Sequence, residues 1–219
     1  MVHKLLLTAG FFISCHGLLT PSKPPIWPPA FSVDFQEDLY HSTIKLSHNN
    51  GSWFYDFTNG RARYDHLRGQ TNNFCAGQKL SDNDPKAPCS LLFTNHSSMY
   101  VFYPEAKTCC VLCGEKEGCT VLKPTWLTNA TYSGNKMFEG QNCTGWSKPG
   151  IFFVDELYMT DKNVPCQYHE QSYKENYIHT LTFNQSSYQI GQPNVSIFEI
   201  PDYCKDICPK PFPPETFMF

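Results

Sequence analysis

The sequence predicts a single, mostly β domain of antiparallel strands that is reinforced by disulfide bonds. Three observations support this prediction: a composition rich in aromatic residues, short segments with period-two alternation, and abundant cysteine. Aromatic residues make up 15% of the 219 positions and charged residues only 17%, a balance that favours strands over helical bundles. The best helical window, residues 170–176, lacks an apolar stripe.

Period-two alternation is clearest near the start of the domain, where Phe31, Val33 and Phe35 alternate with polar residues. Such alternation is typical of a strand with one buried face. Turn-like stretches follow at 58–60 and 161–163. Further short strands are expected at 53–57, 90–94, 99–103, 151–160, 177–183, 188–190 and 195–200.

The N-terminus has the order of a signal peptide. Residues 1–20 contain a short basic region and an apolar run that is too short to span a bilayer. Residues 21–30 are rich in proline and are expected to form an extended leader. The β domain is expected over 31–208, and the tail at 209–219 has no long apolar anchor. We therefore expect a protein without a transmembrane helix that is secreted or lies in the lumen of the secretory pathway.

Six Asn-X-Ser/Thr sequences mark this chain as an extracellular glycoprotein. None has proline in the middle position, so each is a possible acceptor for an N-glycan. One of them has Cys143 in the middle position, where a disulfide would hinder glycan transfer. The predicted acceptors are Asn50, Asn95, Asn129, Asn142, Asn184 and Asn194.

The cysteine count supports the same compartment. Cys15 lies inside the predicted signal peptide, and the ten remaining cysteines form an even set that predicts up to five disulfides. A zinc site at Cys110-X-X-Cys113 would need a second ligand pair that the sequence lacks. Adjacent Cys109 and Cys110 seldom bond to each other, so we expect them to join one strand to two distant segments. The ten are Cys75, Cys89, Cys109, Cys110, Cys113, Cys119, Cys143, Cys166, Cys204 and Cys208.

Several function classes lack support in the sequence. A net charge of −3 without a basic run argues against a nucleic-acid partner. Dispersed histidines and the absence of a Gly-X-Ser-X-Gly elbow argue against an enzyme. Neighbouring Asp65 and His66 are interpreted as a surface pair that points to opposite faces of a strand. Paired carboxylates for glycoside hydrolysis are interpreted instead as polar sides of strands and turns, at Asp34, Glu37, Asp38, Asp155 and Glu156.

No cofactor is predicted, and calcium is a further cation with candidate ligands. Glu37-Asp38 or 82–84 could supply carboxylate oxygens, although neither matches an EF-hand loop. At the turn after 53–57, Asp56 is expected to form a cross-strand ion pair with Arg61 or Arg63. The alternative places Arg63 at the mouth of a cavity, where it would contact a ligand head group.

Several motifs resemble those of ependymin-related secreted proteins, in particular their protist and plant-like relatives. The resemblance extends over about 31–208 and is carried by short blocks. These are Pro88-Cys89-X-X-Leu92-Phe93, Tyr100 to Tyr103 with Lys107-Thr108-Cys109, Trp53 to Asp65, Gly118 to Leu127, Asn129 to Tyr132, and Phe198-X-Ile200-Pro201-X-Tyr203-Cys204.

The resemblance implies a LolA-like fold, in which a strongly curved antiparallel sheet surrounds an apolar cavity. It implies binding of a hydrophobic small molecule without catalysis, with calcium and a homodimer in some members. By position it pairs Cys89 with Cys208, and Cys109 or Cys110 with Cys204. It also implies a local Cys113–Cys119 bond, whereas Cys166 needs a new partner, for which Cys75 and Cys143 are the candidates.

The leading hypothesis is a secreted glycoprotein that binds a lipid or fatty-acid-like ligand. The alternative is an extracellular matrix, coat or cell-adhesion glycoprotein with a filled core and no ligand. A dry apolar cavity of several hundred Å³ would favour the first. The predicted lining residues are Tyr55, Phe57, Arg63, Phe102, Trp126, Trp146, Phe153 and Phe183.

Overall fold

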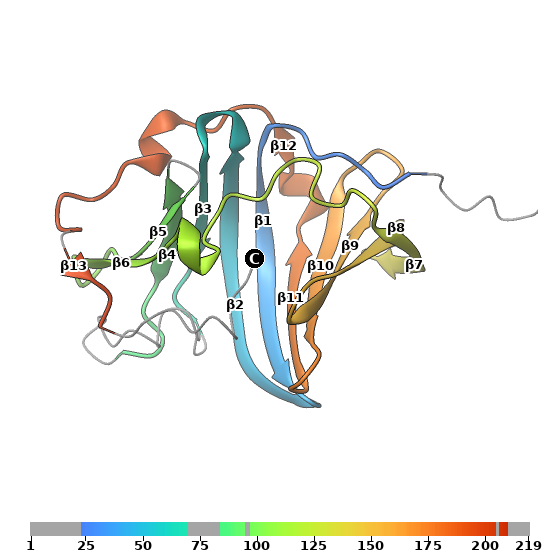
Figure 1. Cartoon of the computed structure of the whole chain (residues 1–219), viewed down its shortest axis with the longest axis horizontal. Helices are drawn as coiled ribbons and strands as arrows, with labels where there is room; N and C mark the ends of the chain where they lie inside the picture. The colour runs from blue at the N-terminus through green and yellow to red at the C-terminus, as the bar shows by residue number, and fades with distance from the viewer. Residues whose placement is uncertain (1–22, 70–83, 95–96, 205, 210–219) are drawn as a thin grey trace, which may run out of the picture.

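The computed structural model describes residues 23–69, 84–94, 97–204 and 206–209. They form a curved β-sheet with short 3-10 turns, and no α-helix occurs among them (Figure 1). The predicted signal peptide therefore lies outside the described residues. The strands are β1 (Ala30–His41), β2 (Ile44–Asp56), β3 (Arg61–His66), β4 (Cys89–Thr94), β5 (Ser98–Tyr103), β6 (Thr108–Gly114), β7 (Thr131–Phe138), β8 (Gln141–Pro149), β9 (Phe153–Met159), β10 (Pro165–Ser172), β11 (Tyr177–Phe183), β12 (Gln189–Ile190) and β13 (Asp206–Ile207).

The strands join one sheet in the order β13-β6-β5-β4-β3-β2-β1-β11-β10-β9-β8-β7, with β12 beside β1. All neighbours pair antiparallel except β13 and β6, which are parallel. The strands β1 to β6 lie side by side in chain order, and so do β7 to β11. The two groups meet where β1 pairs with β11. The prediction of a mostly antiparallel single domain is confirmed.

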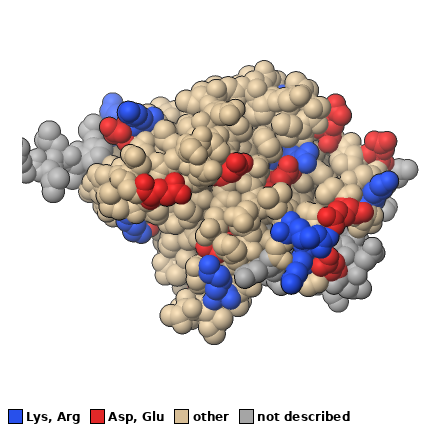
Figure 2. All heavy atoms as spheres, turned by 180° about the vertical axis from the view of Figure 1, so that it is seen from behind, with Lys and Arg blue, Asp and Glu red and all other residues tan. Residues whose placement is uncertain are grey.

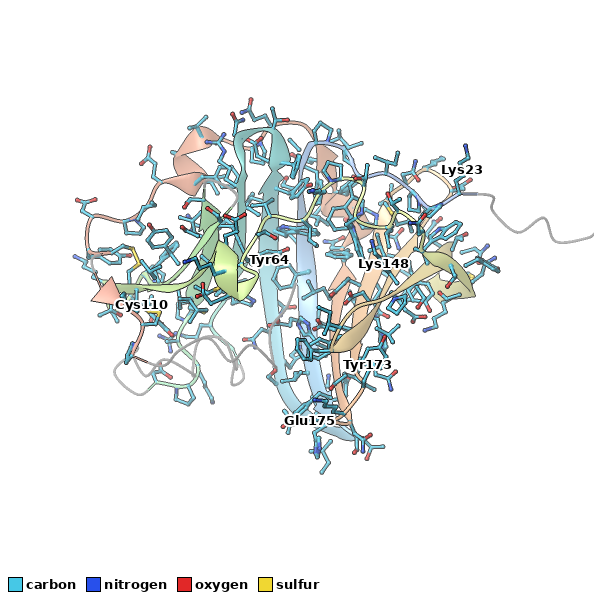
Figure 3. The ribbon with its side chains drawn as sticks, in the orientation of Figure 1. Lys23, Tyr64, Cys110, Lys148, Tyr173 and Glu175 are labelled. Carbon is cyan, nitrogen blue, oxygen red and sulfur yellow. A yellow bond between two sulfur atoms is a disulfide. The ribbon has the colours of Figure 1, made fainter. Side chains whose placement is uncertain are left out.

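The alternating residues predicted from the sequence pack on the concave face. Phe31, Val33 and Phe35 of β1 are all at most 3% exposed. The rings of Phe31 and Trp53 lie 4.8 Å apart at 82°, an edge-to-face contact that favours aromatic packing. Tyr64 lies in the middle of this face (Figure 3) and stacks on Trp53. The concave face thus buries the main core.

The proline-rich leader is part of this core and not only a spacer. Trp27 is 5% exposed, and its ring lies 5.1 Å from Trp53 and 5.4 Å from Trp126. Its backbone nitrogen donates a hydrogen bond of 3.0 Å to the carbonyl of Pro124. The leader and the connection that follows β6 therefore hold each other on the concave face.

The long connection between β6 and β7 crosses the sheet. We call residues 119–130 the crossing segment; it runs in front of β2 and β1 toward β8 (Figure 1). The Tyr55 hydroxyl donates to the Leu122 carbonyl at 2.7 Å, and Leu127 is 1% exposed. These contacts fix the crossing segment over the core.

Disulfide bonds fasten both ends of the sheet. Cys109 bonds to Cys204 and Cys110 to Cys208, so the adjacent pair joins β6 to two points of the C-terminal segment, near the left edge of Figure 3. Local bonds link Cys113 to Cys119, and Cys143 of β8 to Cys166 of β10.

One suggested disulfide is wrong. Cys208 bonds to Cys110 and not to Cys89, because Cys110 shares a backbone register with the strand β13 that precedes Cys208. Cys89 is itself disulfide-bonded, while Cys75, the other candidate partner of Cys166, lies outside the described residues.

The predicted strand at 195–200 is also wrong. Residues Val195–Phe198 form the 3-10 turn η4, because the Asn194 side chain accepts hydrogen bonds from the backbone and hydroxyl of Ser196. Such local side-chain bonds compete with strand pairing. The window at 170–176, considered for a helix, begins in β10.

The sequon asparagines within the described part of the chain all lie at the surface: Asn50, Asn129, Asn142, Asn184 and Asn194 are exposed. Asn95 lies outside that part. Seen from behind, positive and negative side chains are interspersed over the surface (Figure 2). No helix among the described residues is long and apolar enough to cross a bilayer.

Candidate functional site

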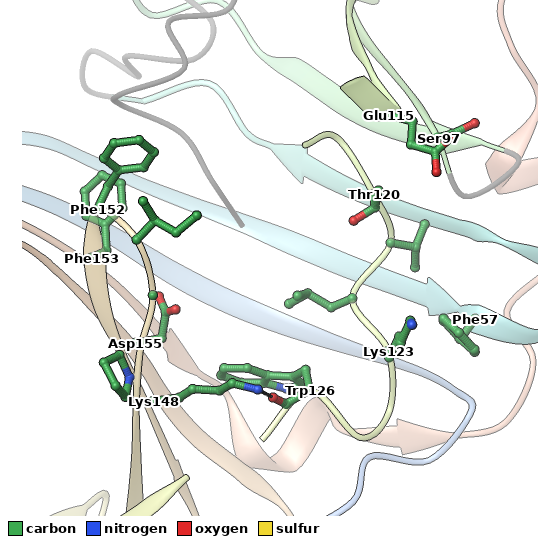
Figure 4. Close-up of a pocket in the computed structure, with 15 residues that line it drawn as sticks. Phe57, Ser97, Glu115, Thr120, Lys123, Trp126, Lys148, Phe152, Phe153 and Asp155 are labelled. Carbon is green, nitrogen blue, oxygen red and sulfur yellow. Dashed lines mark hydrogen bonds between the residues drawn. The ribbon is translucent and has the colours of Figure 1, made fainter. Parts of the chain in front are cut away.

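A cavity of about 770 Å³ lies between the crossing segment and the connection from β8 to β9 (Figure 4). Neither β1 nor β2, which carry the centre of the core, contributes a lining residue. The cavity therefore lies beside the packed core and not at its centre. Its lining consists of Phe57, Ser97, Glu115, Thr120, Val121, Leu122, Lys123, Trp126, Lys148, Pro149, Gly150, Ile151, Phe152, Phe153 and Asp155.

The β8–β9 connection supplies an apolar wall. Ile151 is 81% exposed, whereas Phe153 is 8% exposed, so the wall runs from the rim into the interior. The backbone nitrogen of Gly150 donates to the Phe153 carbonyl at 2.8 Å, and that of Tyr173 donates to the Phe152 carbonyl at 3.0 Å. These bonds close the connection and attach it to the end of β10.

The polar end of the cavity is formed by Asp155 and Lys148, which are paired across β9 and β8. The Lys148 ammonium donates to the carbonyl of Trp126, and to that of Thr128 at 3.3 Å. It therefore ties the crossing segment to β8. Figure 4 shows this bond and the Asp155 carboxylate directed toward the space between the two walls.

Asp155 is an acid in a partly desolvated place. Its Oδ1 accepts a hydrogen bond of 2.7 Å from the Tyr168 hydroxyl. Burial raises the pKa of Asp155 to about 6, the negative charge of Glu170 adds to this, and the Tyr168 bond and Lys148 oppose it. A raised carboxyl pKa follows when desolvation outweighs the available positive charge.

Three of the eight predicted lining residues, Phe57, Trp126 and Phe153, line the cavity. The others do not, because their side chains fill the core or face away from it. Tyr55 and Phe183 are at most 1% exposed within the main core. Trp146 is also buried in that core and has an edge contact with Tyr132, 6.3 Å between ring centroids.

Arg63 and Phe102 lie on the opposite face of the sheet, so the placement of Arg63 at a cavity mouth is wrong. In β3 the buried concave positions are Ala62 and Tyr64, and Arg63 lies between them. Its guanidinium stacks over the Phe102 ring at 4.9 Å and donates to the Ile197 carbonyl at 2.7 Å. It thereby supports the C-terminal segment.

The ion pair at the first turn is formed by Arg61. Its guanidinium lies 2.7 Å from Asp56, whose side chain is 1% exposed. Asp56 also accepts hydrogen bonds from Asn59 and Gln192. The pair is therefore enclosed in a network and fixes the β2–β3 turn.

A second polar group lies on the concave face and is centred on Glu37. Its carboxylate is 2.8 Å from Nε2 of His179 and 3.4 Å from Nε2 of His66, and Nδ1 of His179 is 3.5 Å from Glu170. Burial alone would raise the pKa of Glu37, but the two histidines hold it well below its usual range. Burial opposes the charge on His179, yet its bonds to Glu170 and Glu37 raise its pKa to about 10.

This group corrects two interpretations. His66 is 3% exposed, so it is a buried partner of Glu37 and not a surface residue. Glu37 and Asp38 also do not converge on a calcium ion, because Asp38 binds Lys45 at 2.8 Å and His48 at 2.6 Å. Among the described residues, no group of three or more His, Cys, Asp or Glu has an arrangement that could hold a metal ion.

This chain combines a curved sheet, a crossing segment and a cavity at one side. The model of the family described as "Domain of unknown function (DUF8395)" matches residues 26–204, and the chain belongs to this family. No curated protein sequence matches the chain.

The structure is similar to solved structures of very low sequence identity. An uncharacterized conserved protein from Thermus thermophilus shares 8% identity with a TM-score of 0.51, over 82% of this chain and 90% of that one. A LolA superfamily protein from Nitrosomonas europaea shares 9% identity (TM-score 0.40; 80% of this chain, 92% of that one). Lipoprotein LppX from Mycobacterium tuberculosis shares 11% identity (TM-score 0.43; 75% and 88%). These likenesses concern the fold and not the activity.

From the sequence, Asp155 was placed on the polar side of a strand and was not assigned to the cavity. Asp155 alternates in phase with Phe153, Leu157 and Met159, which are all buried. Residues at i, i+2 and i+4 line one face of a strand. The position of this acid in phase with buried apolar residues was therefore the sequence signal that it lies on the inner face of the strand.

Proposed function

We propose that the protein is a secreted, non-catalytic glycoprotein that binds a hydrophobic small molecule, such as a lipid or a fatty-acid-like compound, in the 770 Å³ cavity. The observation that carries this proposal is the cavity itself, because eight of its fifteen lining residues are apolar or aromatic. Ligand sites typically have volumes of 300–1,000 Å³, mostly apolar walls and few polar groups. Burial of an alkyl chain gains about 0.8 kcal/mol per methylene.

The alternative is an extracellular matrix, coat or adhesion glycoprotein without a ligand. The filled centre of the concave face favours it, since Trp27, Phe31, Trp53 and Tyr55 leave no room there. The two functions therefore differ in whether the side cavity is occupied. We also propose that the chain is related to ependymin-related proteins. A homodimer is a further part of this proposal.

Native mass spectrometry of the protein purified without extraction tests the proposal, together with uptake of the apolar fluorophore N-phenyl-1-naphthylamine. We expect copurified lipid or saturable uptake. Phe152→Asp, which places a charge in the apolar wall, should weaken uptake at least about tenfold, since a charge there must be desolvated when the ligand binds.

Ile190→Asp is the matched control, because Ile190 is 70% exposed on β12 and does not line the cavity. It should leave uptake unchanged. Absence of both copurified lipid and fluorophore uptake would remove the binding function and favour the structural role.

A further inference from the structure

We infer that the cavity selects amphiphiles with a hydrogen-bond-donating or cationic polar end, such as a long-chain alcohol or amine, over anionic ones, and that Asp155 is the specificity-determining residue. This inference rests on the proposed function and names its ligand class. It concerns the polar end of the cavity, whereas the binding function concerns the apolar walls.

The geometry gives Asp155 one fixed oxygen and one that is available. Oδ1 is held by the Tyr168 hydroxyl at 2.7 Å, which orients the carboxylate on β9. Among the described residues, no hydrogen bond to Oδ2 is formed, and a Cβ added to Gly150 would lie 3.7 Å from it. Because Asp155 and Gly150 both line the cavity, this oxygen can accept a bond from a ligand.

Lys148, the cation nearest to Asp155 in the strand register, makes its hydrogen bonds to other groups. Lys148 is paired with Asp155 in register, but its ammonium donates to two carbonyls of the crossing segment. No ion pair joins the two side chains in the part of the chain that the structure describes. The charge of Lys148 lowers the pKa of Asp155 from a distance, but its ammonium does not occupy the carboxylate, so a ligand donor meets an acceptor that no cation contacts.

The strand beside Asp155 brings a second acid to this end of the cavity, Glu170, whose own partner is His179. Tyr168 and Glu170 face Asp155 from β10, and Glu170 adds negative charge. The other charged lining residues, Glu115 and Lys123, belong to the opposite wall (Figure 4). A negative head group at the Asp155 end would thus lie beside like charge, which is unfavourable in a desolvated site.

The acid is costly to the fold, which supports a role in binding. Burial raises the pKa of Asp155 to about 6, so above this pH the charged form is held where it is poorly solvated. Perturbed acids in clefts are enriched at functional sites, and functional residues are commonly retained at the expense of stability.

The experiment is competition against bound N-phenyl-1-naphthylamine by three amphiphiles of equal chain length below their micelle concentrations. Dodecanol, dodecylamine and dodecyl sulfonate differ only in the polar end, and the sulfonate stays anionic throughout. At about pH 8 we expect the amine and the alcohol to compete at least about tenfold more tightly than the sulfonate.

Asp155→Asn keeps the shape and an acceptor for Tyr168 but removes the charge. It should bring the amine and the sulfonate to within about threefold of each other. In the unchanged protein, sulfonate binding should strengthen as the pH falls through about 6, the pKa of Asp155, and Asp155→Asn should abolish this change. The control is Asp161→Asn, on an exposed turn outside the cavity, which should retain the original preference.

Two results would overturn the inference while the binding function stands: equal competition by all three amphiphiles, or tighter sulfonate binding that Lys123→Gln weakens and Asp155→Asn leaves unchanged. If the fluorophore itself does not bind, the proposed function fails and this inference fails with it. Thermal melting of each variant verifies that the fold is retained.

Discussion

The concave face holds two acids, the buried Glu37 and the partly buried Asp155, whose surroundings shift their pKa values in opposite directions. Glu37 lies between His66 and His179, which hold its pKa well below the usual range. Asp155 has a tyrosine hydroxyl as its hydrogen-bond partner, and burial raises its pKa to about 6. Burial raises the pKa of both carboxylates, so the opposite directions of the two shifts arise from the partners. Glu37 contributes to the stability of the sheet, and Asp155 reduces it.

The largest effect is expected from Glu37→Gln. Removing one partner of a buried charge network leaves the other charge uncompensated, which typically costs about 3–5 kcal/mol. Urea unfolding at about pH 7 should show a loss of this size. Glu175→Gln, at an exposed position on the loop after β10, should stay within about 0.5 kcal/mol. A loss below about 1 kcal/mol for Glu37→Gln would show that burial of His66 and His179 does not require the charge of Glu37.

A smaller effect of opposite sign is expected from Asp155→Asn. A group whose pKa is raised by folding, here from 3.8 to about 6, favours the folded state below its unfolded pKa and loses that contribution as the pH rises through its folded pKa. At about pH 8 the variant should therefore be more stable by about 1–3 kcal/mol. Urea unfolding at about pH 8 and pH 4 measures this, and the gain should vanish at the lower pH. A destabilised variant at about pH 8 would contradict this account of Asp155.

The smallest effect is a pH slope that belongs to the Glu37 group. The pKa of His179 is raised from 6.5 to about 10, so its contribution is complete below 6.5 and is lost as the pH rises through 10. Stability should fall by about 1 kcal/mol between pH 6.5 and 7.5, at most about 1.4 per unit. His179→Gln should flatten this slope, whereas Asp155→Asn should not, because Asp155 titrates at lower pH. If stability still fell by the same amount between pH 6.5 and 7.5 in His179→Gln, the pH dependence would belong to another titratable group.

Much of the strand pattern was predictable because alternation records which face is buried. Phe31, Val33 and Phe35 identified β1 directly, and the strands expected at 90–94 and 99–103 are β4 and β5. The strands β6, β7, β8 and β10 were not predicted. In β7 the side chains are mostly exposed and the sequence has no apolar phase. The same lack of burial explains why an edge strand carries little sequence signal.

The site was harder to predict because a strand pattern does not say which of two faces encloses a cavity. Arg63 and Phe102 pack under the C-terminal segment, whose position depends on distant disulfides. The polar clusters, in contrast, carried a signal that was read as ordinary surface. Glu37, His66 and Asp155 each fall in phase with the apolar residues of their own strands.

The paired bonds of Cys109 and Cys110 have a consequence for association between copies of the chain. They hold β13 against β6, so the hydrogen-bonding groups at that margin of the sheet are already partly used. At the other margin, β7 has no further strand beside it in the described part of the chain. Exposed margins recruit strands from other molecules. If two copies of the chain associate by pairing strands, we therefore expect the contact to form at β7 and not at β6, where β13 is already paired.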